Sequence, residues 1–318
     1  MIYFAAVGLP FLILMIFGPG LIKLLKVLSF GQQIRGAGPD SHQKKEGIPT
    51  MGGVLIILAI IITSLIVLDM TSYIVWALIV TIGMGLIGFL DDFIKIRTQN
   101  SLGLRAREKL IGQILFGLLL GFYVYYYSEV GTAVIIPVLG LEFDMGIWII
   151  FFITFIVVGF ANAVNLTDGL DGLASGVTAI VAVSLALLTS VMGYTQLTLF
   201  GLIVAGASLG FVWFNSHPAQ VFMGDVGSLA LGGALSSIVV LSRTELFLVI
   251  IGGVFVIETL SVMLQVLYFK LTGGKRIFKM TPIHHHYELK GLAEVKVVSR
   301  FLIISLIFAL LGLASYFI

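Results

Sequence analysis

Long apolar stretches alternate with short polar segments along the whole chain. A bilayer core of about 30 Å requires about 20 predominantly apolar residues in each helix that crosses it. The pattern therefore predicts ten membrane-spanning helices, at 2–28, 52–68, 74–90, 110–127, 146–164, 172–192, 198–214, 229–241, 244–269 and 299–317. The 229–241 stretch is short for a bilayer, so we expect it to take in flanking residues or to be buried among its neighbours.

The amino-acid composition supports the same class of protein. Hydrophobic residues make up 59% of the chain and charged residues 11%, which excludes an ordinary soluble domain. The first stretch lacks a basic start and a small-residue cleavage site, so we expect a retained helix rather than a removed signal peptide. We predict an all-α integral membrane protein in which residues 1–318 form a single polytopic domain.

Basic residues indicate which loops face the cytoplasm, because short loops rich in Lys and Arg stay there. Of the 18 Lys and Arg residues, only Arg243 falls on the opposite side of the predicted helices; the others cluster in or beside the first, third and ninth loops. We therefore expect both termini outside the cytoplasm. Purely topological signals would explain this clustering, but not which acids accompany the basic residues.

Carboxylates near hydrocarbon are expensive and often mark functional sites. Five of them lie on the basic side, each near an end of an apolar stretch: Asp91, Asp92, Asp168, Asp171 and Asp225. The acids of the opposite loops show no comparable arrangement, and we interpret them as solvated surface charges. Glu258, inside the 244–269 stretch, is either a buried ionisable residue or lies near a water-exposed end.

Two of the acidic motifs also have simpler interpretations. Asp91 and Asp92 end a glycine-rich stretch, where acids oppose the helix macrodipole. A capping role is therefore disfavoured, and a bound cation would offset the repulsion. Asp168 and Asp171 are expected to open the next helix, where an N-cap role for Thr167 or Asp168 stays open.

Asp225 follows Gly224 and precedes a predicted helix, where a carboxylate can ligate a metal while backbone N–H groups hold phosphate. Hard oxygen ligands favour magnesium. Zinc is the competing interpretation of the consecutive His284, His285 and His286, but successive side chains of a regular element do not all converge on one ion. The chain has no cysteine, which excludes thiolate sites. We favour phosphate binding or proton transfer for the imidazoles. No strand–GxxxxGK[ST]–helix loop occurs, so ATP-type hydrolysis lacks support.

Five motifs occur in order on the predicted cytoplasmic face. They are Pro-Thr-Met-Gly-Gly at 49–53, Asp91-Asp92 with Lys95, Asn-Leu-Thr-Asp-Gly-Leu-Asp-Gly at 165–172, Gly224-Asp225 and the triple histidine. Together they resemble the phospho-N-acetylmuramoyl-pentapeptide transferase family, within the polyprenyl-phosphate N-acetylhexosamine 1-phosphate transferase superfamily. The resemblance extends from about residue 35 to about residue 300.

The resemblance implies a magnesium-dependent transferase of the bacterial inner (plasma) membrane. Such an enzyme moves phospho-N-acetylmuramoyl-pentapeptide from UDP-N-acetylmuramoyl-pentapeptide to undecaprenyl phosphate. The products are lipid I and UMP, formed at the cytoplasmic face for peptidoglycan synthesis. The implied partners are the two substrates and the lipid bilayer, with no nucleic acid. A homodimer stays open, as does the choice between a one-step and a covalent two-step mechanism.

The same resemblance implies roles for individual residues. It implies that Asp225 ligates the metal. Asp91 and Asp92 would orient the acceptor phosphate or remove its proton. Lys95 and Lys109 would hold phosphate oxygens. The remaining implied roles are the sugar-phosphate end for His284 and His285, and substrate binding for Lys45, Thr50, Asn165, Asp168, Asp171, Phe222 and His286. Phe222 could stack on uracil.

Two alternatives stay open. A transferase of N-acetylglucosamine 1-phosphate from UDP-N-acetylglucosamine to a polyprenyl phosphate would share most of the motifs, although the triple histidine and Pro-Thr-Met-Gly-Gly favour the muramoyl-pentapeptide branch. An ion-coupled transporter would suit acids and glycine-interrupted helices in a membrane protein. Such a carrier places its charges near the membrane midplane, whereas these acids lie at the ends of the predicted helices.

Overall fold

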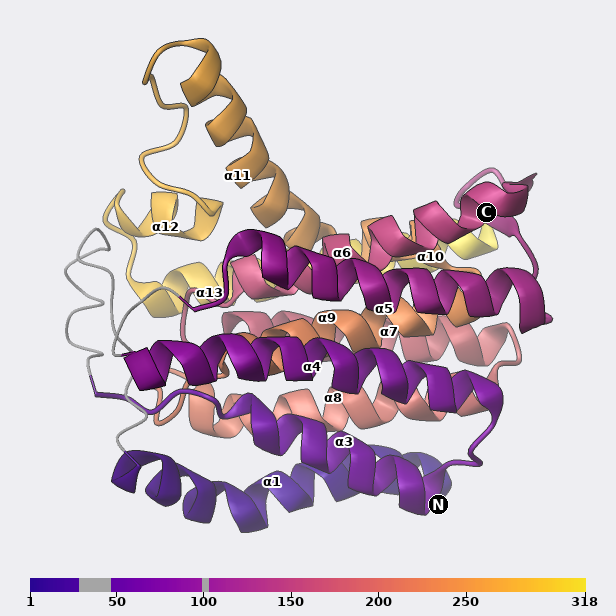
Figure 1. The fold of residues 1–318 in the computed structure, drawn as a ribbon, viewed down its shortest axis with the longest axis horizontal. Helices are drawn as coiled ribbons and strands as arrows, with labels where there is room; N and C mark the ends of the chain where they lie inside the picture. The colour runs from indigo at the N-terminus through magenta and orange to yellow at the C-terminus, as the bar shows by residue number, and fades with distance from the viewer. Residues whose placement is uncertain (29–46, 99–102) are drawn as a thin grey trace.

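The computed structural model of this chain describes residues 1–28, 47–98 and 103–318, and Figure 1 shows a bundle of long helices. The helices are α1 (Ile2–Val27), α3 (Gly53–Val67), α4 (Ser72–Thr98), α5 (Ala106–Tyr127), α6 (Ile149–Thr167), α7 (Leu173–Val191), α8 (Thr195–Asn215), α9 (Gly224–Leu241), α10 (Glu245–Ile251), α11 (Gly253–Leu271), α12 (Ile283–Glu288) and α13 (Glu294–Phe317). A short 3₁₀ helix, η1 (Gly146–Trp148), precedes α6.

The predicted apolar stretches are all helical. Within the described residues, nine helices are long and apolar enough to cross a membrane, and α3 is a shorter apolar helix of 15 residues. Many large hydrophobic side chains are exposed on the outside of the bundle, as expected where a helix faces lipid. The chain is therefore a predominantly helical, multi-pass integral membrane protein.

Several boundaries differ from the sequence prediction, and three of these differences bear on the site. The predicted single helix at 244–269 is wrong, because the chain divides at Gly252 into α10 and α11, and Figure 1 shows α11 leaning away from the bundle. The predicted end at 90 is also wrong, because α4 continues to Thr98. The short 229–241 stretch does take in its flank, since α9 begins at Gly224.

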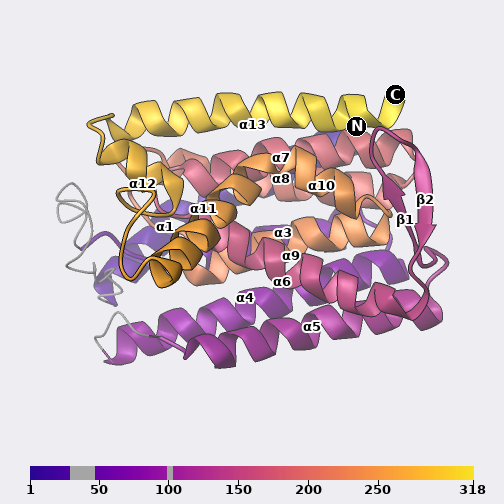
Figure 2. The ribbon, with the colours of Figure 1, turned by 90° about the horizontal axis from the view of Figure 1, so that it is seen from above.

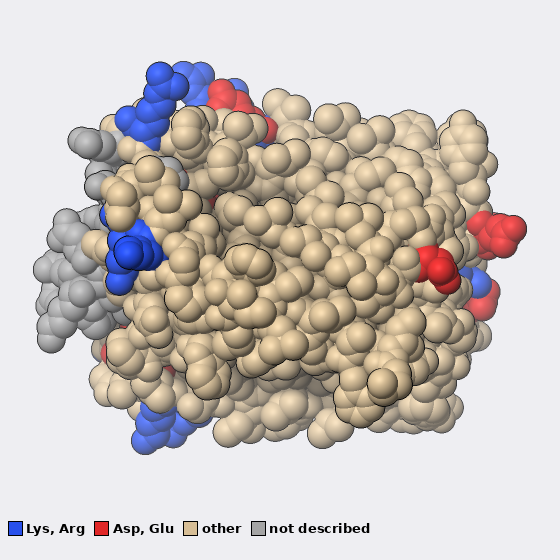
Figure 3. Space-filling view, turned by 90° about the horizontal axis from the view of Figure 1, so that it is seen from below, with Lys and Arg blue, Asp and Glu red and all other residues tan. Residues whose placement is uncertain are grey.

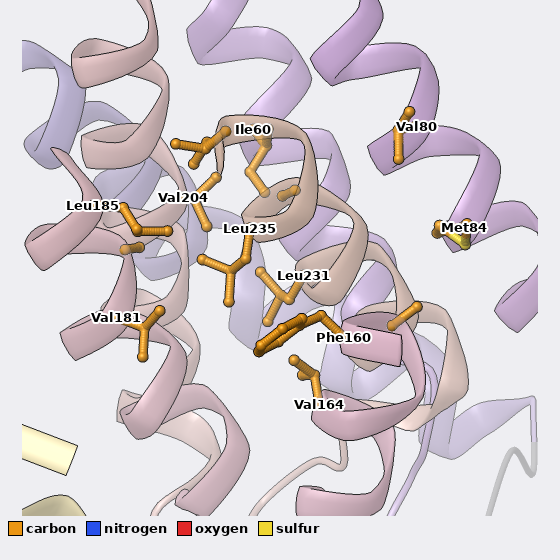
Figure 4. Close-up of a cluster of buried hydrophobic side chains, with 14 of the residues drawn as sticks. Ile60, Val80, Met84, Phe160, Val164, Val181, Leu185, Val204, Leu231 and Leu235 are labelled. Atoms are coloured by element: carbon orange, nitrogen blue, oxygen red, sulfur yellow. The ribbon is translucent and has the colours of Figure 1, made fainter. Parts of the chain in front are cut away.

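Helix α9 is the centre of the bundle, and almost all of its residues are buried. Figure 4 shows Leu231 and Leu235 of α9 among side chains from surrounding helices, including Phe160 of α6 and Met84 of α4. Lipid offers little hydrophobic drive for helices to associate, so close packing and small residues hold such helices together. The packing around α9 therefore fixes the position of its first residues.

The two ends of the bundle differ in charge and structure. Figure 2 shows both chain termini at one end, beside a hairpin of β1 (Ala133–Ile136) and β2 (Leu141–Asp144), whose strands pair antiparallel with Ala133 opposite Asp144. The sequence prediction contained helices alone and missed this hairpin. In Figure 3, Lys and Arg gather at the other end, and the middle of the visible surface carries no charge. We call this end, opposite the chain termini and the β1–β2 hairpin, the basic end.

Candidate active site

A close crossing of α4 and α9 brings three of the predicted aspartates together. Gly88 of α4 packs against the backbone of Asp225, where an added Cβ would collide with the Asp225 carbonyl group. Asp91 and Asp92 follow one turn later on α4, and both are buried. The prediction that they end a helix is wrong, because α4 continues for almost two more turns. Their proximity to Asp225 therefore comes from helix packing rather than from a helix terminus.

The three carboxylates form one cluster, with one oxygen of each of Asp91, Asp92 and Asp225 within 4.8 Å of the others. Lysines neutralise it. Lys95 Nζ contacts Asp91 and lies 3.4 Å from Asp92 Oδ1 and 3.1 Å from Asp225 Oδ2. Lys109 Nζ, from α5, lies 2.8 Å from the same Asp225 oxygen. The carboxylate oxygens of such a cluster can hold a divalent ion, and its lysine side chains can hold phosphate groups.

Each carboxylate is oriented by a further donor. The backbone N–H of Leu104 donates to Asp91 Oδ1 over 2.8 Å, and that of Val226 donates to Asp92 Oδ2 over 3.2 Å. Asn165 donates through Nδ2 to Asp225 Oδ1 over 2.8 Å and to Ser228 Oγ over 2.9 Å. The cluster is thus held from α4, α6, α9 and the segment before α5. Asn165, predicted to bind substrate, lies within it.

The Pro-Thr-Met-Gly-Gly segment pairs with the chain just before α9. The backbone N–H of Phe222 donates to Pro49 O over 2.8 Å, and that of Gly52 donates to Phe222 O over 2.9 Å. Thr50 is buried beside Gly224. The structure therefore brings Thr50 and Phe222 to the acid cluster, while the predicted Lys45 lies outside the described residues.

The loop between α6 and α7 carries the next predicted pair. Asp168 and Asp171 do not open a helix as predicted: Thr167 ends α6, and α7 begins at Leu173, after Gly172 takes a left-handed conformation (φ +80°). Asp168 caps the carboxyl end of α6, so the N-cap interpretation is wrong. Burial raises the pKa of the Asp168 carboxyl to about 8, and the negative charges of Asp225, Asp92 and Asp171 add to the shift.

Asp171 belongs to a second cluster that sequence reasoning missed. Its Oδ2 lies 3.0 Å from His217 Nδ1 and accepts the Ala219 N–H over 3.1 Å. Its own N–H donates to Glu294 Oε1 over 2.8 Å. Both His217 and Glu294 lie on the predicted basic side, at the ends of the 198–214 and 299–317 stretches. Their position on the basic side is the sequence feature that could have identified them as site candidates.

The three consecutive histidines each have a different partner for Nδ1. His284 Nδ1 lies 3.1 Å from Glu258 Oε2, and His285 Nδ1 lies 2.8 Å from Glu288 Oε2. His286 Nδ1 accepts the backbone N–H of Lys279 over 3.0 Å. Partial burial lowers the pKa of His286, and Lys290 and Lys279 lower it further.

The α12 helix, which carries these histidines, lies against the α6–α7 loop. An added Cβ at Gly169 would collide with His284 Nε2 and would lie 3.3 Å from His285 Nε2. The structure thus brings His284 and His285 to the loop of Asp168 and Asp171. Among the described residues, the groups of three or more side chains placed to share a metal are Asp91–Asp92–Asp225 and Asp171–His217–Glu294. Neither group includes residues 284–286.

Comparison with known proteins gives consistent matches. Residues 73–243 match the family described as Glycosyl transferase family 4, and residues 45–57 match the Phospho-N-acetylmuramoyl-pentapeptide-transferase signature 1. The chain is 53% identical over 308 residues to the phospho-N-acetylmuramoyl-pentapeptide-transferase of Bacillus subtilis (strain 168), covering 95% of this chain and 94% of the relative. It is 50% identical over 314 residues to the protein of that name from Geobacillus sp. (strain WCH70), covering 97% and 96%. The protein of that name from Anoxybacillus flavithermus is also 50% identical, over 310 residues that cover 96% and 95%.

Proposed function

The chain belongs to the phospho-N-acetylmuramoyl-pentapeptide transferases, and we propose that its basic end is where it makes lipid I, with magnesium, at the cytoplasmic face of the bacterial inner membrane. The observation that carries the proposal is the cluster of Asp91, Asp92 and Asp225 with two lysines at the basic end of a multi-pass bundle. Ten crossings, with both termini outside the cytoplasm, would place this cluster beside a soluble nucleotide donor.

The reaction exchanges one phosphorus–oxygen bond for another. In the net reaction, an oxygen of undecaprenyl phosphate becomes bonded to the phosphorus attached to the sugar of UDP-N-acetylmuramoyl-pentapeptide, and the bond to the departing UMP breaks, either in one step or through a covalent intermediate on the enzyme. Negative charge is redistributed among phosphate oxygens, so the main catalytic demand is for placed positive charge. The cluster fits this demand, because its lysines already contact carboxylates from two helices.

The oxygen ligands of the cluster suit magnesium, which prefers a few carboxylates together with substrate phosphates. Asp225, with Asp91 and Asp92 beside it, would hold the ion, and the ion would supply charge neutralisation on the diphosphate. Lys95 and Lys109 are placed to turn from the carboxylates to phosphate oxygens. Asp91 or Asp92 would orient the acceptor phosphate or take its proton.

The flanking segments would bind the donor. Phe222, half-buried before α9, offers an aromatic face for uracil, and Thr50 lies on the paired segment. The α6–α7 loop, with Asp168 and Asp171, and the facing histidines of α12 would contact the rest of the nucleotide and the sugar phosphate. Lys45 stays in the proposal as a nucleotide contact.

The proposal is tested by purified protein in detergent, supplied with undecaprenyl phosphate, magnesium and one donor at a time. We expect UMP release with UDP-N-acetylmuramoyl-pentapeptide and none when the lipid is left out. Release with UDP-N-acetylglucosamine alone would instead assign the related N-acetylglucosamine 1-phosphate transfer. Transport of a donor into proteoliposomes without UMP release would contradict the proposal and favour a carrier. Against a carrier, the acid cluster lies at the basic end and not at the bundle middle.

A further inference from the structure

Helix α11 carries one fully buried acid in an otherwise lipid-facing environment. Glu258 and His284 both have an exposed fraction of 0%. Nearby on the same helix, Leu260, Met263 and Leu264 are exposed by 47% to 60%. Glu258 thus points inward, and its Oε2 lies 3.1 Å from His284 Nδ1. An ionisable residue kept at this depth needs a partner and usually a function.

The contact with His284 is the interaction that compensates Glu258. Within the described part of the chain, neither carboxylate oxygen of Glu258 accepts a hydrogen bond from any other group, and neither ring nitrogen of His284 is hydrogen-bonded elsewhere. A buried carboxylate is costly unless a proton or a cation compensates it. The Oε2–Nδ1 contact, over 3.1 Å, is where such compensation can take place.

The opposite edge of the His284 ring faces the candidate active site. Its Nε2 lies against Gly169, the residue that follows Asp168, where an added Cβ would collide with the ring. The imidazole is therefore held between a carboxylate of α11 on one edge and the α6–α7 loop on the other. His285 and His286 differ, because their Nδ1 partners, Glu288 and the Lys279 backbone, lie within 7 residues in the chain.

We propose that Glu258 is a positioning residue for the transfer reaction. Its carboxylate holds Nδ1 of His284, which fixes the ring orientation and presents Nε2 towards the sugar-phosphate end of the donor at Gly169. Carboxylates that hold an imidazole in this way set which nitrogen carries the proton. The inference rests on the proposed function, in which α12 contacts the donor, and it adds a residue from a helix that no predicted motif reaches.

The test is a double-mutant cycle with Glu258→Gln, His284→Gln and the double variant, measured as UMP release by folded, detergent-purified protein. We expect Glu258→Gln to lower kcat by at least about tenfold and to leave the donor KM nearly unchanged. In the His284→Gln background the same change should have almost no further effect. The control is Glu245→Gln, which alters another buried glutamate, on α10, and should leave kcat unchanged.

An equal loss from Glu258→Gln in both backgrounds would overturn the proposal, since it would show that the carboxylate acts independently of His284. Wild-type kcat in Glu258→Gln would overturn it as well. The absence of UMP release from the wild-type protein would instead contradict the proposed function.

A second variant reaches the same ring without altering Glu258, should Glu258→Gln fail to fold. Gly169→Ala would push against His284 Nε2, and we expect a similar loss of kcat. The matched control is Gly159→Ala on the preceding helix α6, where an added Cβ meets no atom within 4 Å. Equal activity of the two alanine variants would overturn the proposal.

Discussion

Asn165 of α6 donates a hydrogen bond from Nδ2 to Oδ1 of Asp225 at the start of α9, over 2.8 Å. The other oxygen of Asp225 faces Lys109 at 2.8 Å and Lys95 at 3.1 Å. One carboxylate is thus fixed by donors from three helices, with an amide on one side and two lysines on the other. An amide cannot neutralise charge, so Asn165 orients Asp225, while the lysines balance its negative charge and can turn to phosphate oxygens when a metal ion takes their place on the carboxylate.

Replacement of this amide by a carboxylate should therefore impair the site. Asn165→Asp removes a donor to Asp225 and places a like charge about 3 Å away. We expect kcat for UMP release to fall by about 100-fold. The matched control is Ser228→Ala, which removes the other hydrogen bond of the same amide and leaves Asp225 with its donor. Equal losses in the two variants would show that the Asn165–Asp225 bond has no special role.

Magnesium should be required, with Asp225 as its main ligand. We expect excess chelator to stop UMP release and added magnesium to restore it, because the diphosphate needs charge neutralisation. Asp225→Asn should remove nearly all activity and leave the melting temperature of the detergent-purified protein close to that of the wild type. Asp144→Asn, at an exposed strand end, should be fully active. Full turnover in excess chelator would contradict the metal assignment.

The apolar stretches were predictable because a bilayer demands long runs of apolar residues, and these runs locate every predicted helix. The break at Gly252 was not predictable from hydropathy, because the apolar run continues on both sides of the Gly252-Gly253 pair. The low helix propensity of these glycines ends α10. The extension of α4 was missed for a related reason. Asp91 and Asp92 end the apolar run, but Lys95 pairs with both of them inside the helix, so the charges do not terminate it.

The acid cluster was predictable as a set of residues on one face, but its geometry was not. That Asp91, Asp92 and Asp225 approach within 4.8 Å depends on the crossing at Gly88, which is a tertiary contact with no local signal. The surroundings of Asp171 also depend on tertiary contacts that the sequence does not reveal. Its partners His217 and Glu294 are 46 and 123 residues away in the chain, and motif reading assigned neither.

The acids and the nucleotide pocket should divide the kinetic effects between them. We expect Asp91→Asn to lower kcat with little change in donor KM, because the group acts in the chemical step and Asn can still accept the Leu104 N–H. Phe222→Ala should mainly raise the donor KM, because it removes a ring that binds uracil in ground state and transition state alike. Initial rates over a range of donor concentrations separate the two effects. The reverse pattern would exchange the two roles.

Stability without metal should depend on pH through Asp168. The pKa of its carboxyl is raised from 3.8 to about 8, so the folded chain binds this proton more tightly than the unfolded chain. Between these two values the folded state is therefore destabilised as pH rises. Asp168→Asn removes the titration, and its melting temperature in chelator should exceed that of the wild type by more at pH 8 than at pH 5.

Asp144→Asn provides the control of opposite sign. Hydrogen bonds from the Thr132 hydroxyl and the Gly146 N–H lower the pKa of Asp144, so its contribution to stability is present above its unfolded pKa and is lost as pH falls through the folded value. Asp144→Asn should therefore lower the melting temperature slightly at pH 8 and less at pH 3. The same trend in both variants would contradict the assignment of the effect to Asp168.

Sidedness separates the enzyme from a carrier, because a cytosolic nucleotide donor requires the basic end to face the cytoplasm. The native chain has no cysteine, so single cysteines report without background. Lys275→Cys and Lys290→Cys lie at exposed positions of the basic end, and Thr71→Cys and Thr195→Cys at exposed positions of the opposite end. In intact cells, a membrane-impermeant thiol reagent should label the two threonine positions and spare the two lysine positions. Labelling of Lys290→Cys from outside would overturn the cytoplasmic site. Substrate-dependent labelling of one position from both sides would indicate alternating access, and thus a carrier.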